Sequence, residues 1–232
     1  MISAAASPLH FDLRCSDCSQ QAIADASACA GCGGLLEFAL SEGARLDSAA
    51  WRALLSTRRS SSSHLDRSGV WRFRELLPPI DRAHVVTLRE GDVPIYEARD
   101  GAGYAGAKNV RYLHLGMNPT ASFKDTGMTV AMSHARSRGA RIAVCASTGN
   151  TSASMAAYAA RAGIVAVVLL PAEGISESKL AQTLDYGARV IAIGGDFDAA
   201  FSVVRSLDPS RYAVVNSVNP FRIEGQKTAA LV

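Results

Sequence analysis

The chain has 232 residues, of which 48% are hydrophobic, and this length and composition allow one or two domains with a buried core. Its 24 basic and 21 acidic residues leave a formal net charge of +3, too small to indicate binding to nucleic acid or to a membrane surface. The longest apolar run, Ile164 to Leu170, is too short to span a bilayer, and Met1 to Leu9 lacks the basic and apolar regions of a signal peptide. We therefore expect a cytosolic protein that acts on a small molecule.

The N-terminal region contains two C-x-x-C pairs with a spacing typical of zinc sites. Cys15 and Cys18 form the first pair, and Cys29 and Cys32 form the second after ten intervening residues. Two such pairs can place four thiolates tetrahedrally around one zinc ion, and four protein ligands leave no open position for catalysis. We therefore expect a structural zinc in a small zinc-ribbon-like segment.

Two other interpretations of these cysteines stay open. A pair of disulfides would use the same residues, although the expected reducing compartment disfavours it. Thioredoxin-like redox chemistry needs a C-x-x-C pair at a strand-to-helix junction of a larger fold. The sequence around Cys15 and Cys29 indicates no such junction.

The changing pattern of the sequence divides the chain into three parts. Residues 1–40 form the zinc-ribbon-like segment and residues 41–69 form a linker. Residues 70–232 form the main domain, which includes a small helical and β-α-β subdomain at about 122–212.

The predicted linker carries only weak structural signals. A short helix is expected around Ala49 to Leu55, and the run from Ser60 to Ser63 is typical of a flexible connector. We interpret Arg58 and Arg59, beside this run, as solvated charges.

From Asn109 onward, short apolar runs alternate with stretches of helical length. The runs show little polar alternation and are bounded by turn residues, as strands buried on both faces are. The expected strands are Val110–Leu115, Ile142–Ala146, Val165–Leu170, Val190–Ile193 and Ala213–Val215, and the expected helices are Lys124–Arg138, Ser152–Ala162, Glu177–Tyr186 and Asp198–Leu207. This alternation predicts an α/β fold with right-handed β-α-β crossovers and an open parallel sheet flanked by helices.

One lysine occupies an unusual position at the start of the first of these helices. Lys124 follows a strand that Asn118 and Pro119 end, and Ser122 with Asp125 is predicted to form a capping-box-like pair at the helix N-terminus. The positive end of the helix dipole disfavours an ammonium group in the first turn and favours a neutral, nucleophilic amine. We therefore interpret Lys124 as a catalytic candidate and not as a surface lysine.

Two loops that follow predicted strands could bind an anionic ligand near Lys124. The loop from Ser147 to Thr151 opens into a helix, so its free amides and hydroxyls suit a carboxylate or a phosphate, with an ordinary N-cap turn as the alternative. The second loop lies at the start of the stretch from Asn216 to Thr228. Its Ser217 and Arg222 could bind an anion, because a guanidinium matches phosphate bidentately. Ligands of such sheets bind at the carboxyl ends of the strands, so these loops should face one crevice.

These motifs are similar to those of a known enzyme family. The chain resembles the threonine synthases, which belong to the fold type II, tryptophan synthase β-like enzymes dependent on pyridoxal phosphate. The resemblance rests on the runs from Asn118 to Asp125, from Ser147 to Thr151 and from Asn216 to Thr228, and on Glu90-Gly91 before Pro94. Serine and threonine dehydratases and cysteine synthases share the first two runs, whereas N-P-x-R-x-E-G-Q-K-T is more specific. An N-terminal zinc-ribbon-like piece also occurs in some members.

The resemblance implies a carbon-oxygen lyase that converts O-phospho-L-homoserine and water into L-threonine and phosphate. Lys124 would form the internal aldimine with the cofactor and later move protons among the substrate carbons, while Asn150 would bond the cofactor's 3-hydroxyl and Phe123 would also contact it. The substrate-binding residues that it implies are Ser147, Thr148, Asn150 and Thr151, with Ser217 and Arg222 as candidates for the phosphate.

The sequence departs from the family pattern in three respects. Thr126 stands where arginine is common and Ala121 where glycine is frequent, and neither position carries the covalent chemistry. The chain also ends at Val232 inside a predicted helix, without the family's second half, and that half holds the glycine-rich loop for the cofactor phosphate and the partner of the pyridine nitrogen. We therefore expect the N-terminal portion of such an enzyme, with full activity in doubt for this chain alone.

Two further functions remain open at this point. A dehydratase or a β-replacement enzyme could use the same fold, since fold does not fix the reaction. A non-catalytic, zinc-bearing interaction protein derived from the enzyme is the second alternative. The expected partners are a small amino acid substrate and a possible second copy of the chain, with no nucleic acid or membrane.

Overall fold

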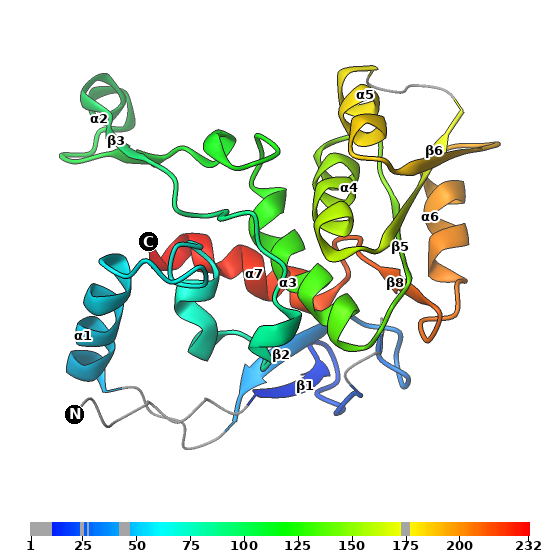
Figure 1. The fold of residues 1–232 in the computed structure, drawn as a ribbon, viewed down its shortest axis with the longest axis horizontal. Coiled ribbons are helices and arrows are strands. Elements are labelled where there is room, and N and C mark those ends of the chain that lie inside the picture. The colour runs from blue at the N-terminus through cyan, green and yellow to red at the C-terminus, as the bar shows by residue number, and fades with distance from the viewer. Residues whose placement is uncertain (1–10, 24–25, 27, 42–46, 173–176) are drawn as a thin grey trace.

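The computed structural model of the chain describes residues 11–23, 26, 28–41, 47–172 and 177–232. Residues 1–10, on which the expectation about a signal peptide rests, lie outside these ranges, as do parts of the predicted zinc-ribbon-like segment and linker. Within the described ranges, no helix combines the length and the apolar character needed to cross a bilayer. The α-helices are α1 (Ser48–Arg59), α2 (Arg99–Ala105), α3 (Lys124–Ser137), α4 (Asn150–Ala162), α5 (Glu177–Asp185), α6 (Phe197–Arg205) and α7 (Pro220–Lys227); Figure 1 shows them along the chain.

The main domain is organised around a parallel sheet with the strand order β7-β6-β5-β8. Its strands are β5 (Ile142–Ala146), β6 (Val165–Pro171), β7 (Arg189–Ile193) and β8 (Tyr212–Val214). These bounds agree with the predicted strands to within one residue at each end, and the helices between them lie where the alternation places them. The predicted α/β fold with an open parallel sheet is therefore confirmed.

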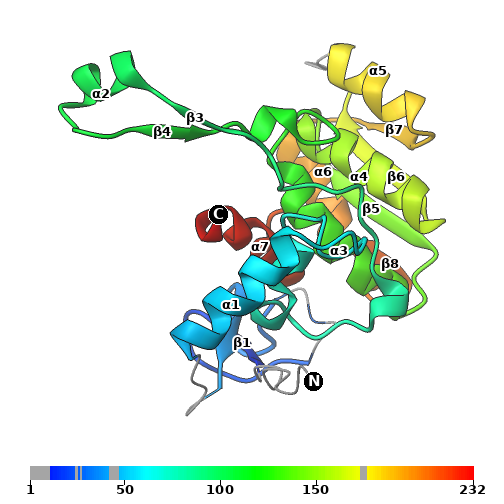
Figure 2. The same cartoon turned by 60° about the vertical axis from the view of Figure 1, so that its left-hand side comes forward.

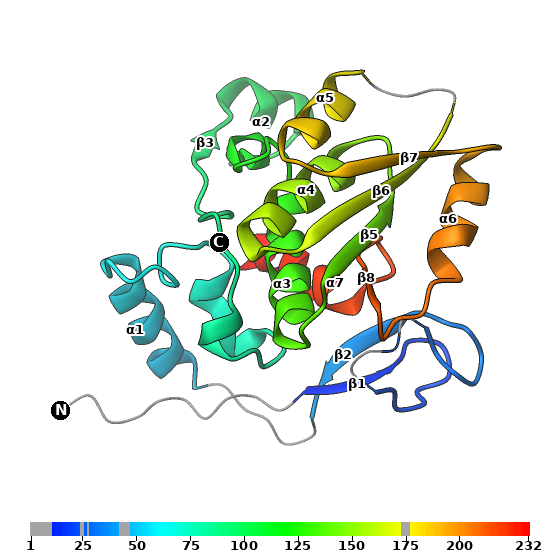
Figure 3. The ribbon, with the colours of Figure 1, turned by 45° about the vertical axis from the view of Figure 1, so that its right-hand side comes forward.

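Helices cover both faces of this sheet, as Figure 3 shows. On one face, Ala143 and Cys145 of β5 pack in a core with Met132 of α3 and Met155 of α4. On the other face, the alternate residues of β5 pack against α6, with Val204 in the shared cluster. In β5 the residues of both faces are buried, which explains its unbroken apolar run, whereas β7 at the edge of the sheet has no buried residue.

One predicted strand does not belong to the parallel sheet. The run Val110–Leu115 contains β4 (Arg111–Leu113), which pairs in antiparallel register with β3 (Ile95–Glu97). The prediction of a buried strand was wrong because Arg111 and His114 interrupt the run and Tyr112 is 55% exposed. With α2 between them, β3 and β4 form an arm that extends away from the rest of the domain in Figure 2.

The region predicted as a linker contains an ordered ion-pair cluster. Helix α1 is longer than the predicted Ala49–Leu55, mainly at its C-terminal end, and Asp47 caps its N-terminus by accepting the amide hydrogen of Ala49 at 2.9 Å. Arg58 near its C-terminal end is only 5% exposed and pairs with both Glu75 and Asp66. The interpretation of Arg58 as a solvated charge was therefore wrong, whereas Arg59 is exposed as expected.

The N-terminal segment folds as a hairpin of β1 (Phe11–Cys15) and β2 (Leu36–Leu40). Its strands pair in antiparallel register, with Cys15 opposite Leu36. Figures 1 and 3 both place this hairpin beside the main domain, where Phe38 packs against Phe221 of α7. The hairpin therefore shares an apolar contact with the helix that follows the last strand of the sheet.

Candidate active site

The loop before Lys124 is held in place by a buried asparagine. Asn118 accepts the amide hydrogen of Gly91 on Oδ1 at 2.8 Å and donates from Nδ2 to the carbonyl of Leu115 at 2.9 Å. Ala121 then turns the chain with a φ of 59°, in the left-handed region that favours glycine. This is the position where the family frequently has glycine, so the substitution keeps the turn at some cost in backbone strain.

Lys124 is the first residue of α3, as predicted, but the cap of the helix differs from the predicted capping box. Ser122 Oγ accepts the amide hydrogen of Lys124 at 3.0 Å. Asp125 does not reach back to Ser122, because its carboxylate accepts the amide and hydroxyl hydrogens of Thr120 at 2.7 and 2.6 Å. Asp125 also accepts the Ser154 hydroxyl of α4 at 2.6 Å, so this buried carboxylate joins the loop, α3 and α4.

The Lys124 side chain is half-buried, and its amine is electronically suited to nucleophilic chemistry. Nζ lies 4.0 Å from the centroid of the Phe123 ring. Burial lowers the pKa of Lys124, and the positive charge of Arg222 lowers it further. The low pKa expected from the helix dipole therefore has two other causes, desolvation and a neighbouring cation.

The loop from Ser147 to Thr151 enters α4 at Asn150 and presents polar atoms beside the carboxyl end of β5. Ser147 Oγ accepts the amide hydrogen of Gly149 at 3.2 Å. Asn150 Oδ1 is buried and has no hydrogen-bond partner among the described residues. Burying an unpaired carbonyl oxygen costs free energy, so this atom is suited to a ligand hydroxyl that can donate to it.

Arg222 lies within the structure and not on its surface. Its side chain is 0% exposed, and the guanidinium donates to the Val215 carbonyl at 2.9 Å and to Thr151 Oγ1 at 3.2 Å. Nε has no hydrogen-bond partner in the described part of the chain, and burial lowers the pKa of the group. The structure thus brings Arg222 together with Thr151 and within electrostatic range of Lys124.

Ser217, the other predicted phosphate ligand, has a different environment. It is exposed on the loop between β8 and α7, and no hydrogen bond of the described residues joins it to Arg222 or Thr151. Thr148 is half-buried in the first loop. Among the predicted substrate residues, a direct contact therefore links only Thr151 and Arg222 within the described ranges.

Two glycines bring α7 close to the helix that carries Lys124. A Cβ at Gly225 of α7 would collide with the carbonyl oxygen of Thr126, and a Cβ at Gly127 of α3 would lie 2.6 Å from the carbonyl oxygen of Arg222. The two helices therefore touch backbone to backbone within one turn of Lys124. This close packing fixes the distance between Lys124 and Arg222.

Asn216 is a positioning residue that the sequence did not single out by itself. Its side chain forms two hydrogen bonds with the backbone of Ala146. Asn216 Nδ2 donates to the Ala146 carbonyl at 2.9 Å, and Asn216 Oδ1 accepts the Ala146 amide hydrogen at 3.1 Å. These bonds tie the start of the Ser147 loop to the end of β8. The signal was present in the sequence, since Asn216 opens the family-specific run.

A second buried carboxylate, that of Glu90, is hydrogen-bonded to α4, the helix that begins at Asn150. Glu90 is 0% exposed and accepts hydrogen bonds from the hydroxyls of Ser68 (2.6 Å), Thr87 (3.0 Å) and Tyr158 (2.7 Å) and from the amide of Leu88 (3.0 Å). Burial raises the pKa of Glu90, although the hydroxyl donors oppose the shift. The bond to Tyr158 anchors α4, whose first residue is Asn150.

Replacing Glu90 by glutamine is expected to change the pH dependence of stability. A raised folded-state pKa means that the stability from Glu90 is present below its unfolded value of 4.5 and is lost as the pH rises through the folded value. Glu90→Gln removes this titration. The free energy of unfolding of the variant should therefore increase relative to that of the parent chain as the pH rises above 4.5. Denaturant unfolding at several pH values measures this difference, and Glu97→Gln, at an exposed position, controls for net charge. If the difference in free energy of unfolding between Glu90→Gln and the parent chain did not change with pH, the raised pKa of Glu90 would be contradicted.

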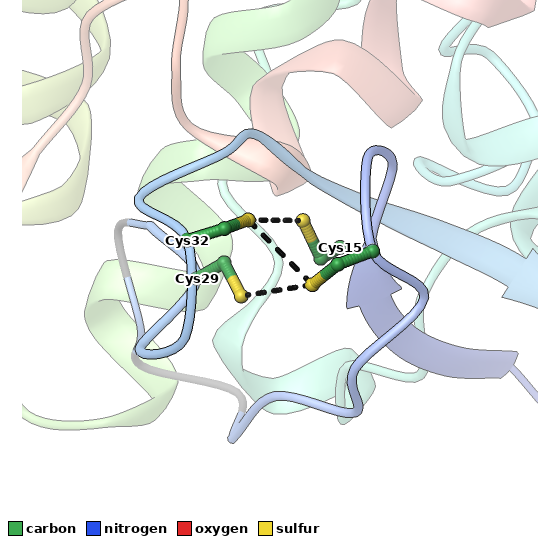
Figure 4. Close-up of side chains that lie close together, drawn as sticks. Cys15, Cys29 and Cys32 are labelled. Carbon is green, nitrogen blue, oxygen red and sulfur yellow. Dashed lines mark hydrogen bonds between the residues drawn. The ribbon is translucent and has the colours of Figure 1, made fainter.

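The four N-terminal cysteines converge on one point, as Figure 4 shows for three labelled members. All four Sγ atoms lie within 4.8 Å of one another, with Cys15 and Cys32 3.5 Å apart and Cys18 and Cys29 3.6 Å apart. Zinc bonded tetrahedrally to four sulfurs at about 2.3 Å requires sulfur separations of about 3.8 Å. The backbone amides of Cys32 and Gly31 lower the pKa of Cys29 to about 7, whereas hydrogen bonds with neighbouring thiols raise the pKa of Cys18 and Cys32. The cysteine cluster therefore fits a zinc ion.

Comparison with known proteins places these features in context. Residues 86–231 match the family model described as pyridoxal-phosphate dependent enzyme. Threonine synthase of Methanocaldococcus jannaschii is 47% identical over 163 residues, which cover 70% of this chain and 40% of that protein. Threonine synthase of Synechocystis sp. is 49% identical over 184 residues, which cover 78% of this chain and 44% of that protein. The chain thus spans less than half the length of these curated relatives, and the resemblance expected from its motifs is confirmed.

Solved structures share the fold. The processed form of threonine deaminase isoform 2 from Solanum lycopersicum matches with a TM-score of 0.53 and 20% identity, over 80% of this chain and 45% of that chain. Escherichia coli diaminopropionate ammonia lyase in its apo form matches with a TM-score of 0.55 and 15% identity, over 67% of this chain and 54% of that chain. These matches confirm the expected fold type II architecture.

Proposed function

Because the chain belongs to the family of pyridoxal-phosphate dependent enzymes, we propose that it binds this cofactor covalently through Lys124. We propose further that it serves a threonine synthase reaction, in which O-phospho-L-homoserine and water give L-threonine and phosphate. The observation that carries the proposal is the half-buried Lys124 amine, whose pKa is lowered by burial and by Arg222. A lower pKa increases the fraction of the neutral amine, which is the nucleophile that an aldehyde cofactor requires.

The residues around Lys124 have separate roles in this proposal. Asn150 accepts a hydrogen bond from the 3-hydroxyl of the cofactor on its unpaired Oδ1. Phe123 lies against the Lys124 side chain and limits the access of water on that side. When bound, the cofactor ring withdraws electrons from the substrate carbon next to the amino group.

The substrate is held by hydroxyls and by one guanidinium. Ser147, Thr148 and Thr151 bind the amino acid carboxylate at the start of α4, where the amides of the first turn also attract an anion. Arg222 and Ser217 bind the phosphate of the substrate, with Arg222 already fixed against Thr151. The free Lys124 amine then takes a proton from one substrate carbon and returns it to another.

We also propose that Cys15, Cys18, Cys29 and Cys32 hold one structural zinc. The convergence of four sulfurs supports this, because four ligands complete a tetrahedral site and leave no position for a substrate. Since such a site needs reduced thiols, a cytosolic location is proposed with it.

Product analysis tests the proposed reaction. The chain is incubated with pyridoxal phosphate and O-phospho-L-homoserine, and threonine and inorganic phosphate are measured together. The proposal predicts equal amounts of both products. If a parallel incubation with threonine forms 2-oxobutanoate and O-phosphohomoserine yields no threonine, the chain is a dehydratase instead. Absence of any product, together with absence of cofactor binding, would favour a non-catalytic interaction protein.

A further inference from the structure

A stack of three rings joins the N-terminal hairpin to the helix that carries Arg222. Phe38 of β2 meets Phe221 of α7 edge to face, with ring centroids 4.8 Å apart and an interplanar angle of 68°. Phe221 in turn stacks on His134 of α3, with centroids 3.5 Å apart and an angle of 10°. Phe221 is only 5% exposed, so this contact is part of the packed interior.

On the hairpin side, Phe38 rests on the cluster built from the cysteines. Leu13, Cys15, Cys29 and Leu36 form one buried apolar cluster, and Phe38 packs against it. Two of these four residues belong to the proposed zinc site. The position of the Phe38 ring therefore depends on how the cysteine loops are held.

On the other side, Phe221 directly precedes Arg222 in the first turn of α7. Asn219 caps this turn by accepting the amide hydrogen of Arg222 on Oδ1 at 3.0 Å. One turn further along the same face of α7, Gly225 touches α3 backbone to backbone. Helix α7 is thus enclosed by α3 and by the hairpin ring, and a displacement of Phe221 is also a displacement of Arg222.

We propose that the N-terminal four-cysteine hairpin positions Arg222 at the Lys124 site through the contact between Phe38 and Phe221. The proposal rests on the proposed function in one respect, that Lys124 and Arg222 are residues of the active site. The ring contacts themselves do not depend on the proposed function. The hairpin thereby acts as a structural support for the active site.

The pKa of Lys124 offers a way to measure whether the hairpin positions Arg222. Among the described residues, Arg222 from α7 is the charged group that acts on Lys124, whereas the neighbouring Asp125 carboxylate is held by Thr120 and Ser154. Burial and the Arg222 charge both lower the pKa of Lys124. If the hairpin contact is lost, α7 loosens, water reaches the amine and Arg222 moves away. Both changes raise the pKa of Lys124.

The test measures the pKa of Lys124 without cofactor or substrate. The chain contains four lysines, at positions 108, 124, 179 and 227, so competitive acetylation over a range of pH, followed by peptide mass spectrometry, resolves each one. Exposed Lys108 is the internal reference. Phe38→Ala removes the ring, Phe38→Leu keeps apolar volume without the edge-to-face contact, and Leu40→Ala changes a 46% exposed residue of the same strand.

The expected result is an upward shift of the Lys124 midpoint by about half a pH unit or more in Phe38→Ala. A smaller shift in the same direction is expected in Phe38→Leu, and none in Leu40→Ala. If Phe38→Ala fails to fold, as circular dichroism would reveal, Phe38→Leu decides the outcome. An unchanged midpoint in the folded Phe38 variants would overturn the inference. Since no cofactor is present, that result would leave the proposed binding of pyridoxal phosphate untouched.

Discussion

The variant Lys124→Ala is expected to lose completely the visible absorbance that the parent chain gains when it is mixed with pyridoxal phosphate. That absorbance requires a covalent bond between the cofactor aldehyde and an amine. Lys124 offers a half-buried amine with a lowered pKa at the start of α3. Absorbance spectroscopy of the dialysed complexes measures the difference.

Two matched variants control this experiment. Lys108→Ala removes an exposed lysine beside the arm, and Lys227→Ala removes the lysine that pairs with Glu224 of α7 at 2.6 Å. Both are expected to keep the absorbance of the parent chain. Equal absorbance in Lys124→Ala and the parent chain would mean that the cofactor is bound elsewhere, and the assignment of the site would fail.

Removing zinc is expected to unfold the N-terminal hairpin. Structural zinc sites contribute on the order of 10 kcal/mol of apparent folding free energy, far more than the small apolar cluster of this hairpin can supply. Metal analysis of the purified chain should find one zinc ion per chain. A strong chelator should remove this ion, and the unfolding transition of the hairpin should then be absent from the thermal unfolding curve.

Cysteine variants separate this effect from the general loss of a buried thiol. Cys18→Ser and Cys32→Ser change exposed members of the cluster and should abolish zinc binding. Cys145→Ala changes a buried cysteine in the core of the sheet and should retain one zinc. A purified chain without metal, whose four N-terminal cysteines are found as two disulfides, would contradict the zinc assignment.

The parallel sheet could be predicted because its central strands β5 and β6 are largely buried on both faces. Burial on two faces leaves an unbroken apolar run, as in β5, and the sequence displays such runs directly. Lys124 was predicted to begin a helix and does so, although the run before it is not part of the parallel sheet, whereas Asn150, predicted in a loop, is the first residue of α4. The predicted convergence of the cysteines followed from their spacing.

The remaining features depend on tertiary contacts that no local pattern encodes. Asp125 has the spacing of a capping box, but Thr120 and Ser154 offer it closer donors. Arg58 lies in the last turn of α1, and only the fold brings Glu75 and Asp66 to it. The causes of the low Lys124 pKa could not be predicted either, because Arg222 lies 98 positions along the chain and approaches through the packing of α7 on α3.

Reductive trapping tests most directly whether this chain holds pyridoxal phosphate on Lys124. The chain is incubated with the cofactor, treated with borohydride and digested, and the four lysine-containing peptides are examined by mass spectrometry. The expected result is a phosphopyridoxyl group on the peptide that contains Lys124, at close to one per chain. A label that is absent, or that is spread equally over Lys108, Lys179 and Lys227, would contradict the account.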